Sequence, residues 1–214
     1  MEAKRIDFLD EDGILLYENV VSSEQLEDWY QRIKTFAHFR QMATADKDGD
    51  SDYGHAKMQQ AYAWQANFNS PEIIKEINEN PNIMSKVSDV DKQQPEGFEL
   101  MEEIWDNITF KCNWNLEPIQ QYINAFNHGD NTWGHTDWYE YTVIFYPNNH
   151  WDSQIMGGET LFFDEEFKFI RAAVACTPGN VVVFKGNIPH KAGLVSRETL
   201  HARLSVVYQC KGSI

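Results

Sequence analysis

Two histidines and one aspartate stand at spacings that suit a metal centre. His135 and Asp137 are two residues apart, and on an extended chain this spacing points both side chains the same way. His190 follows Ile188-Pro189 at the end of a β-rich run. Two imidazoles and one carboxylate on one face, with other coordination positions open, are a ligand set for non-haem Fe(II). An HxD pair alone is a weak signal, so the rest of the chain must support this interpretation.

A second group of residues could bind a carboxylate near that metal. Arg203 and Ser205 open the last β-rich run, thirteen residues after His190, and offer a guanidinium fork beside a hydroxyl. Such a pair suits the far carboxylate of a dicarboxylate. Arg197, seven residues after His190, is the alternative. Arg203 is favoured because it begins a β-rich strand.

The second half of the chain is typical of a β-sandwich or barrel, because short β-branched and aromatic runs alternate with turn residues. The predicted strands cover residues 119–127, 141–146, 159–163, 172–176, 180–184 and 203–208. Asn124 and Phe126 lie on the first of them and point to the same side. If the polar turn that follows returns the chain, this is the side of the metal ligands.

The first half is predicted to hold a short strand over 13–21 and three helices. Ser22 and Gln25 have the spacing of a capping box, and apolar residues then recur at helical intervals over about 23–37. A second helix is expected to begin at Ser70-Pro71, with proline at its first position. A third is expected over about 95–105.

The stretch from Gln41 to Asn69 contains four aspartates at alternate positions from Asp46, which raises the question of a calcium loop. An EF-hand loop needs glycine at its sixth position and glutamate at its twelfth. Counted from Asp46, the chain has Ser51 and Lys57 there. We therefore expect a solvated loop, of a length that could cover an active site.

The composition excludes several classes of protein. The chain has 214 residues, a size that suits one domain with a real core, and 42% of them are hydrophobic. Its 18 Lys and Arg stand against 33 Asp and Glu, for a net charge of −15, and 23 of the acids lie in residues 1–107. A chain this acidic is expected to bind neither duplex nucleic acid nor an anionic membrane, because both require positive charge.

The cysteines and the lack of long apolar runs indicate the cellular compartment of the protein. Cys112, Cys176 and Cys210 are odd in number and widely spaced, which predicts neither a disulfide framework nor a zinc–thiolate site. The first twelve residues are charged, and no apolar run reaches the roughly 18 residues of a membrane span. We expect a soluble, cytoplasmic protein.

Short motifs follow one another in the second half of the chain. In order, they are Asn124-Ala125-Phe126-Asn127-His128-Gly129, His135-Thr136-Asp137, Ile144-Phe145-Tyr146-Pro147-Asn148, Trp151-Asp152, Gly157-Gly158-Glu159-Thr160, residues 178–184, Pro189-His190 and Arg203-Leu204-Ser205. In the order and spacing of these motifs, residues 122–208 resemble the Fe(II)/2-oxoglutarate-dependent dioxygenases. Within that superfamily, they resemble the prolyl 4-hydroxylase-like branch. The stretch from Tyr146 to Gly158 is similar to the oxygen-sensing prolyl hydroxylases in particular.

The resemblance implies a mainly β fold with N-terminal helices, whose core is a double-stranded β-helix of the jelly-roll type. Residues 1–214 would form a single catalytic domain, with a strand, supporting helices and a loop over 1–117 and the core over 118–211. His135, Asp137 and His190 would be the iron ligands.

The same resemblance assigns residues to the cosubstrate. Arg203 would bind the C5 carboxylate of 2-oxoglutarate with help from Tyr146 and Ser205, and Asn124 could reach its other end. Phe126 stands where many members of the family have tyrosine, so one hydrogen bond to the cosubstrate would be lost or moved.

The implied activity is hydroxylation of a C–H bond with O2, coupled to oxidative decarboxylation of 2-oxoglutarate to succinate and CO2. Related halogenases replace the carboxylate ligand with a small residue, so Asp137 favours hydroxylation. The branch suggests a prolyl residue in a peptide or protein as substrate. A free amino acid or other small metabolite is the first alternative, and a non-catalytic jelly-roll binding protein is the second. Nothing in the sequence indicates the oligomeric state.

Overall fold

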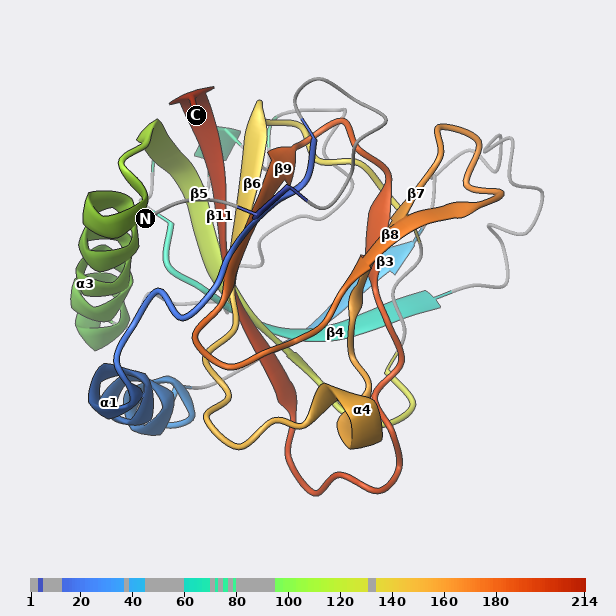
Figure 1. Cartoon of the computed structure of the whole chain (residues 1–214), viewed down its shortest axis with the longest axis horizontal. Helices are drawn as coiled ribbons and strands as arrows, with labels where there is room; N and C mark the ends of the chain where they lie inside the picture. The colour runs from blue at the N-terminus through green and yellow to red at the C-terminus, as the bar shows by residue number, and fades with distance from the viewer. Residues whose placement is uncertain are drawn as a thin grey trace.

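Two β-sheets that face one another form the centre of the described part of the protein (Figure 1). The structure is a computed structural model that describes residues 4–5, 13–36, 39–44, 60–69, 95–130 and 134–214, together with residues 72, 75, 76 and 79. In the described residues, neighbouring strands pair in the larger sheet in the order β1 (Lys4–Arg5), β2 (Leu15–Tyr17), β9 (Val181–Lys185), β6 (Tyr141–Phe145), β11 (Arg203–Ser213), β5 (Asn115–Phe126), β4 (Gln60–Asn67) and β3 (Phe39–Thr44). The smaller sheet has the order β10 (His190–Ala192), β7 (Thr160–Phe163) and β8 (Ile170–Val174).

The larger sheet has a hydrophobic core on each of its faces, because successive residues of a strand point to opposite sides. Ile123 and Val143 belong to the core that includes the helices, whereas Tyr122 and Ile144 belong to the core between the two sheets. Two facing antiparallel sheets in this order form the predicted double-stranded β-helix. The structural neighbours described below confirm that fold.

Two helices, α1 (Ser23–Ile33) and α3 (Pro95–Cys112), lie together on one side of the larger sheet, away from β7 and β8, whereas the short α4 (Ser153–Met156) lies apart from them (Figure 1). The first, α1 (Ser23–Ile33), has the predicted capping box with Ser22 and Gln25, and it ends earlier than expected. The third predicted helix is longer than expected and forms α3 (Pro95–Cys112). Residues 72, 75, 76 and 79 are helical, as predicted, although Ser70-Pro71 lies outside the described residues. A short α4 (Ser153–Met156) was not predicted. No helix in the described ranges is long and apolar enough to span a membrane.

The prediction of a loop from Gln41 to Asn69 is wrong at both ends of that stretch. Residues 39–44 and 60–67 form strands β3 and β4, which pair with each other in antiparallel register, and β4 then pairs with β5. Asp46, Ser51 and Lys57 lie outside the described residues. The first half of the chain therefore contributes strands to both ends of the larger sheet, as well as α1 and most of α3.

The six predicted strands are all present, with different ends. The first begins at Asn115 and the last continues to Ser213, because β5 and β11 pair along almost their whole length. His135 forms a single bridge to His190 beside the smaller sheet, with backbone hydrogen bonds of 3.0 and 2.9 Å. This bridge brings the HxD segment next to β10.

Candidate metal centre

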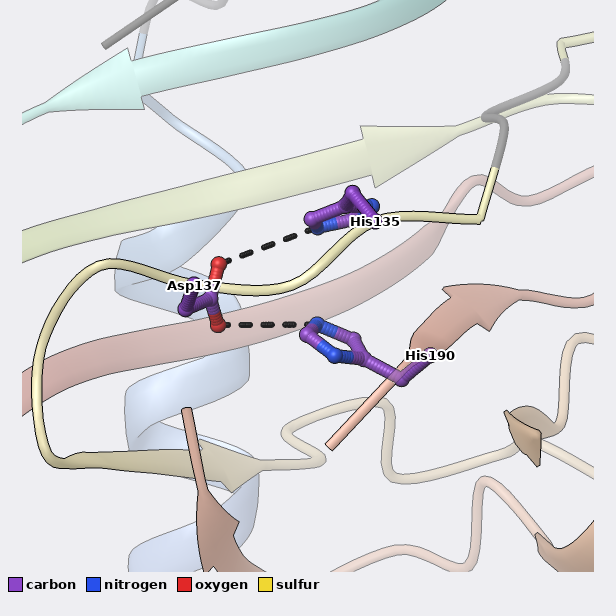
Figure 2. A group of neighbouring side chains, drawn as sticks. All are labelled: His135, Asp137 and His190. Carbon is purple, nitrogen blue, oxygen red and sulfur yellow. Dashed lines mark ion pairs between the residues drawn. The ribbon is translucent and has the colours of Figure 1, made fainter. Parts of the chain in front are cut away.

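Three side chains predicted to bind iron lie close together and point toward one another (Figure 2). One ligand atom from each of His135, Asp137 and His190 lies within 4.8 Å of the other two. His135 Nε2 is 3.8 Å from Asp137 Oδ1, and His190 Nε2 is 3.5 Å from Asp137 Oδ2. Among the described residues this is the group of metal-binding side chains that the fold brings together.

His190 is buried and held in one orientation. Its Nδ1 lies 2.9 Å from the carbonyl oxygen of Ile188, which accepts a hydrogen bond from Nδ1–H and leaves Nε2 with its lone pair. Phe184 packs edge-on against the imidazole, with ring centroids 4.7 Å apart. Burial lowers the pKa of His190 to about 4, in spite of the nearby Asp137 carboxylate, so the imidazole is neutral at pH 7. A neutral, oriented imidazole is the form that binds a metal.

Asp137 is fixed at its backbone and at its side chain. Its backbone N–H donates to the carbonyl oxygen of Gly186 at 2.7 Å, which ties the HxD segment to the end of β9. Its Oδ2 accepts a hydrogen bond of 2.5 Å from the Thr142 hydroxyl. The carboxylate is therefore oriented before any metal binds.

Gly186 allows this close approach because it has no side chain. A Cβ added there would lie 2.0 Å from the backbone oxygen of Tyr139 and 3.2 Å from that of Asp137. Both atoms belong to the backbone, so the segment must shift to make room.

We expect Gly186→Ala to lower the affinity for Co²⁺, which serves as a probe for the divalent metal site, by about tenfold or more. Losses of this size follow when the outer partners of a metal site are displaced. Titration calorimetry measures this, with His201→Ala as a control, because His201 is exposed and lies outside the site. Equal Co²⁺ affinity in the wild type and Gly186→Ala would contradict it.

Arg203 is a buried cation deeper in the same barrel. Its side chain is enclosed by hydrogen bonds from Nε to the Gly158 carbonyl at 2.6 Å, from Nη1 to Ser205 Oγ at 3.2 Å and from Nη2 to Thr160 Oγ1 at 3.1 Å. No carboxylate of the described residues forms an ion pair with it. A buried guanidinium whose hydrogen bonds here run to neutral oxygens can pair with an anionic ligand.

Aromatic and polar groups complete the surroundings of Arg203. The guanidinium lies 5.5 Å from the Phe126 ring centroid and 5.6 Å from that of Tyr146. The Tyr146 hydroxyl lies 2.8 Å from Thr160 Oγ1, and burial raises the pKa of Tyr146 well above its usual value, so the phenol stays protonated. Arg203 thus has hydroxyl groups beside it that could also bind an anion.

Strand register links this cationic site to the metal ligands. Thr160 pairs with Ala192 and Phe162 pairs with His190, so Thr160 and His190 are diagonal neighbours on paired strands. Such neighbours are about 7–8 Å apart. A short dicarboxylate could therefore contact both sites.

The alternative arginine lies elsewhere. The Arg197 side chain is 81% exposed and its Nε donates to the Glu198 carboxylate at 3.1 Å. Arg203, in contrast, is 2% exposed. Of the two arginines, Arg203 is therefore the one that lies inside the barrel.

Asn124 and Phe126 share a face of β5, as the alternation predicted. Asn124 pairs in register with Ser205, and its Oδ1 accepts a hydrogen bond of 2.9 Å from Gln65 Nε2 on β4. Because the oxygen is engaged, the amide nitrogen of Asn124 is the group left to donate to a ligand.

Three residues that contact this site were not among the predicted site residues. Thr160 stands in the quoted Gly157-Gly158-Glu159-Thr160 motif, and the motif alone does not show that its hydroxyl lies between Arg203 and Tyr146. Thr142 shares a strand face with Tyr146, so the period of two could have placed it inside the barrel. No local signal connects Gln65 with Asn124, 59 residues later.

The donor set fits the group that the motifs imply. Two imidazole nitrogens and one carboxylate suit a divalent transition metal, and the set resembles the facial triad of non-haem iron sites. The buried guanidinium with adjacent hydroxyls suits a dicarboxylate. The residues that the motifs imply for an iron and 2-oxoglutarate site therefore lie in the same barrel.

Comparison with known proteins rests on structure. No protein-family model and no curated protein sequence matches the chain. A Trichoplax adhaerens prolyl hydroxylase, solved with a peptide fragment of hypoxia inducible factor, has a TM-score of 0.55 at 12% identity, covering 94% of this chain and 84% of that one. A Pseudomonas putida prolyl-4-hydroxylase has a TM-score of 0.55 at 12% identity and covers 95% of each chain. A Burkholderia pseudomallei oxidoreductase of the 2OG-Fe(II) oxygenase family has a TM-score of 0.56 at 14% identity, covering 94% and 85%.

These neighbours match nearly the whole chain, including the half for which sequence motifs gave only an outline. The resemblance read from the motifs is thereby confirmed at the level of the fold. The protein has the double-stranded β-helix fold of the prolyl hydroxylases and related 2OG-Fe(II) oxygenases.

Proposed function

We propose that this protein is an Fe(II)- and 2-oxoglutarate-dependent oxygenase that hydroxylates a C–H bond. His135, Asp137 and His190 would hold the iron, and Arg203 would bind the far carboxylate of 2-oxoglutarate. One observation carries the proposal: a His-Asp-His group and a buried guanidinium, unpaired with any described carboxylate, line the same barrel. A binding protein without catalysis has no need of both.

The protein's own residues would orient the reactants and exclude water. When bound, iron and 2-oxoglutarate supply the oxidative chemistry, which releases succinate and CO2. The hydrogen bond to Ile188 holds His190 with Nε2 toward the site, and the hydroxyl of Thr142 holds the Asp137 carboxylate. The buried rings of Phe162 and Phe184 pack around His190 and exclude water from that side of the site.

The exposure of the three metal-binding side chains supports a substrate that approaches the site from the side of His135. The His135 side chain is 39% exposed, whereas those of Asp137 and His190 are 7% exposed. An open mouth of this kind admits a residue that belongs to a longer chain. Together with the peptide complex of the Trichoplax neighbour, this favours a prolyl residue in a peptide or protein as substrate.

The activity test is substrate-stimulated formation of succinate from 2-oxoglutarate under air, after anaerobic loading with Fe(II). We expect the wild type to form succinate and His135→Ala to lose both Fe(II) binding and turnover, because one of three ligands is gone. His201→Ala is the matched control, since His201 is exposed and outside the site. Wild-type activity in His135→Ala would contradict the assignment.

The substrate test compares proline-containing peptides with free amino acids in the same assay. We expect peptides to stimulate succinate formation and to gain the mass of one oxygen atom. If only free amino acids respond, the enzyme acts on a small metabolite instead. Ligand binding that persists without Fe(II) and 2-oxoglutarate, with no turnover, would support the non-catalytic alternative.

A further inference from the structure

Thr142 lies inside the barrel, next to the carboxylate that would bind iron. Thr142 is 1% exposed and belongs to β6. It stands two positions before Ile144, so both side chains lie on the face of β6 that points between the two sheets. The hydroxyl donates a hydrogen bond of 2.5 Å to Asp137 Oδ2. Because an ionised carboxylate only accepts hydrogen bonds, the direction of this bond is fixed.

The two oxygens of Asp137 therefore differ. Oδ1 lies 3.8 Å from His135 Nε2, and no described residue donates a hydrogen bond to Oδ1. Oδ2 lies 3.5 Å from His190 Nε2 and is also held by Thr142. Free rotation of the carboxylate about its Cβ–Cγ bond would break that short bond. One oxygen is thus engaged by the protein and the other is available.

We propose that Thr142 is a positioning residue that restricts Asp137 to a single metal bond, with Oδ2 held by the hydroxyl and Oδ1 as the ligand atom. The inference rests on the proposed function and adds the control of coordination number to it. A carboxylate that used both oxygens would fill one of the open positions that 2-oxoglutarate and O2 need. Thr142 keeps that position open.

The test uses Co²⁺ as a probe, because the intensity of its visible absorption rises as coordination number falls. Thr142→Val removes the hydroxyl with little change in shape, and Thr142→Ser retains it. We expect the Co²⁺ complex of Thr142→Val to absorb less intensely than that of the wild type, because a two-oxygen carboxylate raises the coordination number. We expect its affinity for 2-oxoglutarate, measured by calorimetry, to fall about tenfold, in the range for outer partners of metal ligands. Thr142→Ser should restore both.

Thr109→Val on α3 is the matched control, because the buried Thr109 hydroxyl has no hydrogen-bond partner among the described residues. Thermal unfolding shows whether each variant is folded, and Thr142→Ala replaces Thr142→Val if the latter is not. An unchanged Co²⁺ spectrum and 2-oxoglutarate affinity in the hydroxyl-free variant would overturn the inference and leave the proposed function standing. A weaker Co²⁺ affinity with an unchanged spectrum would also overturn it. A wild type that binds no divalent metal would overturn both.

Discussion

Replacing Arg203 with leucine is expected to raise the KM for 2-oxoglutarate by about 100-fold or more. The guanidinium is the buried cation of the barrel, and the loss of one partner from a buried, hydrogen-bonded charge pair costs about 2–5 kcal/mol in binding. The KM of Arg203→Lys should lie between those of the wild type and Arg203→Leu. Lysine keeps the positive charge but lacks the planar guanidinium that reaches Ser205 and Thr160. Initial rates of succinate formation at varied 2-oxoglutarate measure the effect.

Arg197→Leu is the matched control for this experiment. It removes the same group from an exposed position whose partner is Glu198, so the KM should stay within about twofold, as expected for an exposed ion pair. Far-ultraviolet circular dichroism checks that Arg203→Leu is folded, because the Gly158 carbonyl loses its donor. A raised KM in Arg197→Leu with an unchanged one in Arg203→Leu would reverse the assignment.

Replacing Asp137 with alanine is expected to abolish turnover and to weaken binding of Fe(II) by more than about 100-fold. Mutating a residue that only supports a metal ligand weakens metal binding by up to about 100-fold. Removing the ligand itself should weaken it more. Asp137→Asn keeps the size and can still accept a hydrogen bond from Thr142, so a loss in this variant isolates the negative charge. Anaerobic Fe(II) titration and succinate formation are the two measurements.

The control for the carboxylate is Asp106→Ala, which removes an exposed acid from α3. Its Fe(II) affinity and turnover should equal those of the wild type. If Asp137→Ala retained both, the His-Asp-His group would not be the metal site. If Asp137→Ala bound Fe(II) normally but was inactive, the carboxylate would serve the reaction without holding the metal.

The barrel could be predicted from the sequence because its strands carry local signals. Short β-branched runs between turns locate β6, β7, β8 and β9, and the fixed order of motifs indicates how they are connected. The spacing of His135 and Asp137 needs only an extended chain to bring both side chains to one face. The position of Arg203 at the start of a strand likewise favoured it over Arg197.

Features that depend on contacts far apart in the chain could not be predicted. Strands β3 and β4 lie on either side of a polar, aspartate-rich stretch, whose composition is typical of a loop. Strand β10 has three residues, and its role becomes visible only through its pairing with β7 and its bridge to His135. The bonds from Thr142 to Asp137 and from Gln65 to Asn124 follow from strand packing and have no sequence signal of their own.

The pairing of β4 with β5 has a practical consequence for expressing the motif-bearing half by itself. A fragment beginning at residue 118 would retain the candidate ligands, yet β5 would lose the partner that covers its outer edge. The apolar face that packs on α1 and α3 would also be exposed to water. An open strand edge beside an uncovered apolar face favours self-association. Any fragment used for biochemistry should therefore retain the first half of the chain, which covers both surfaces.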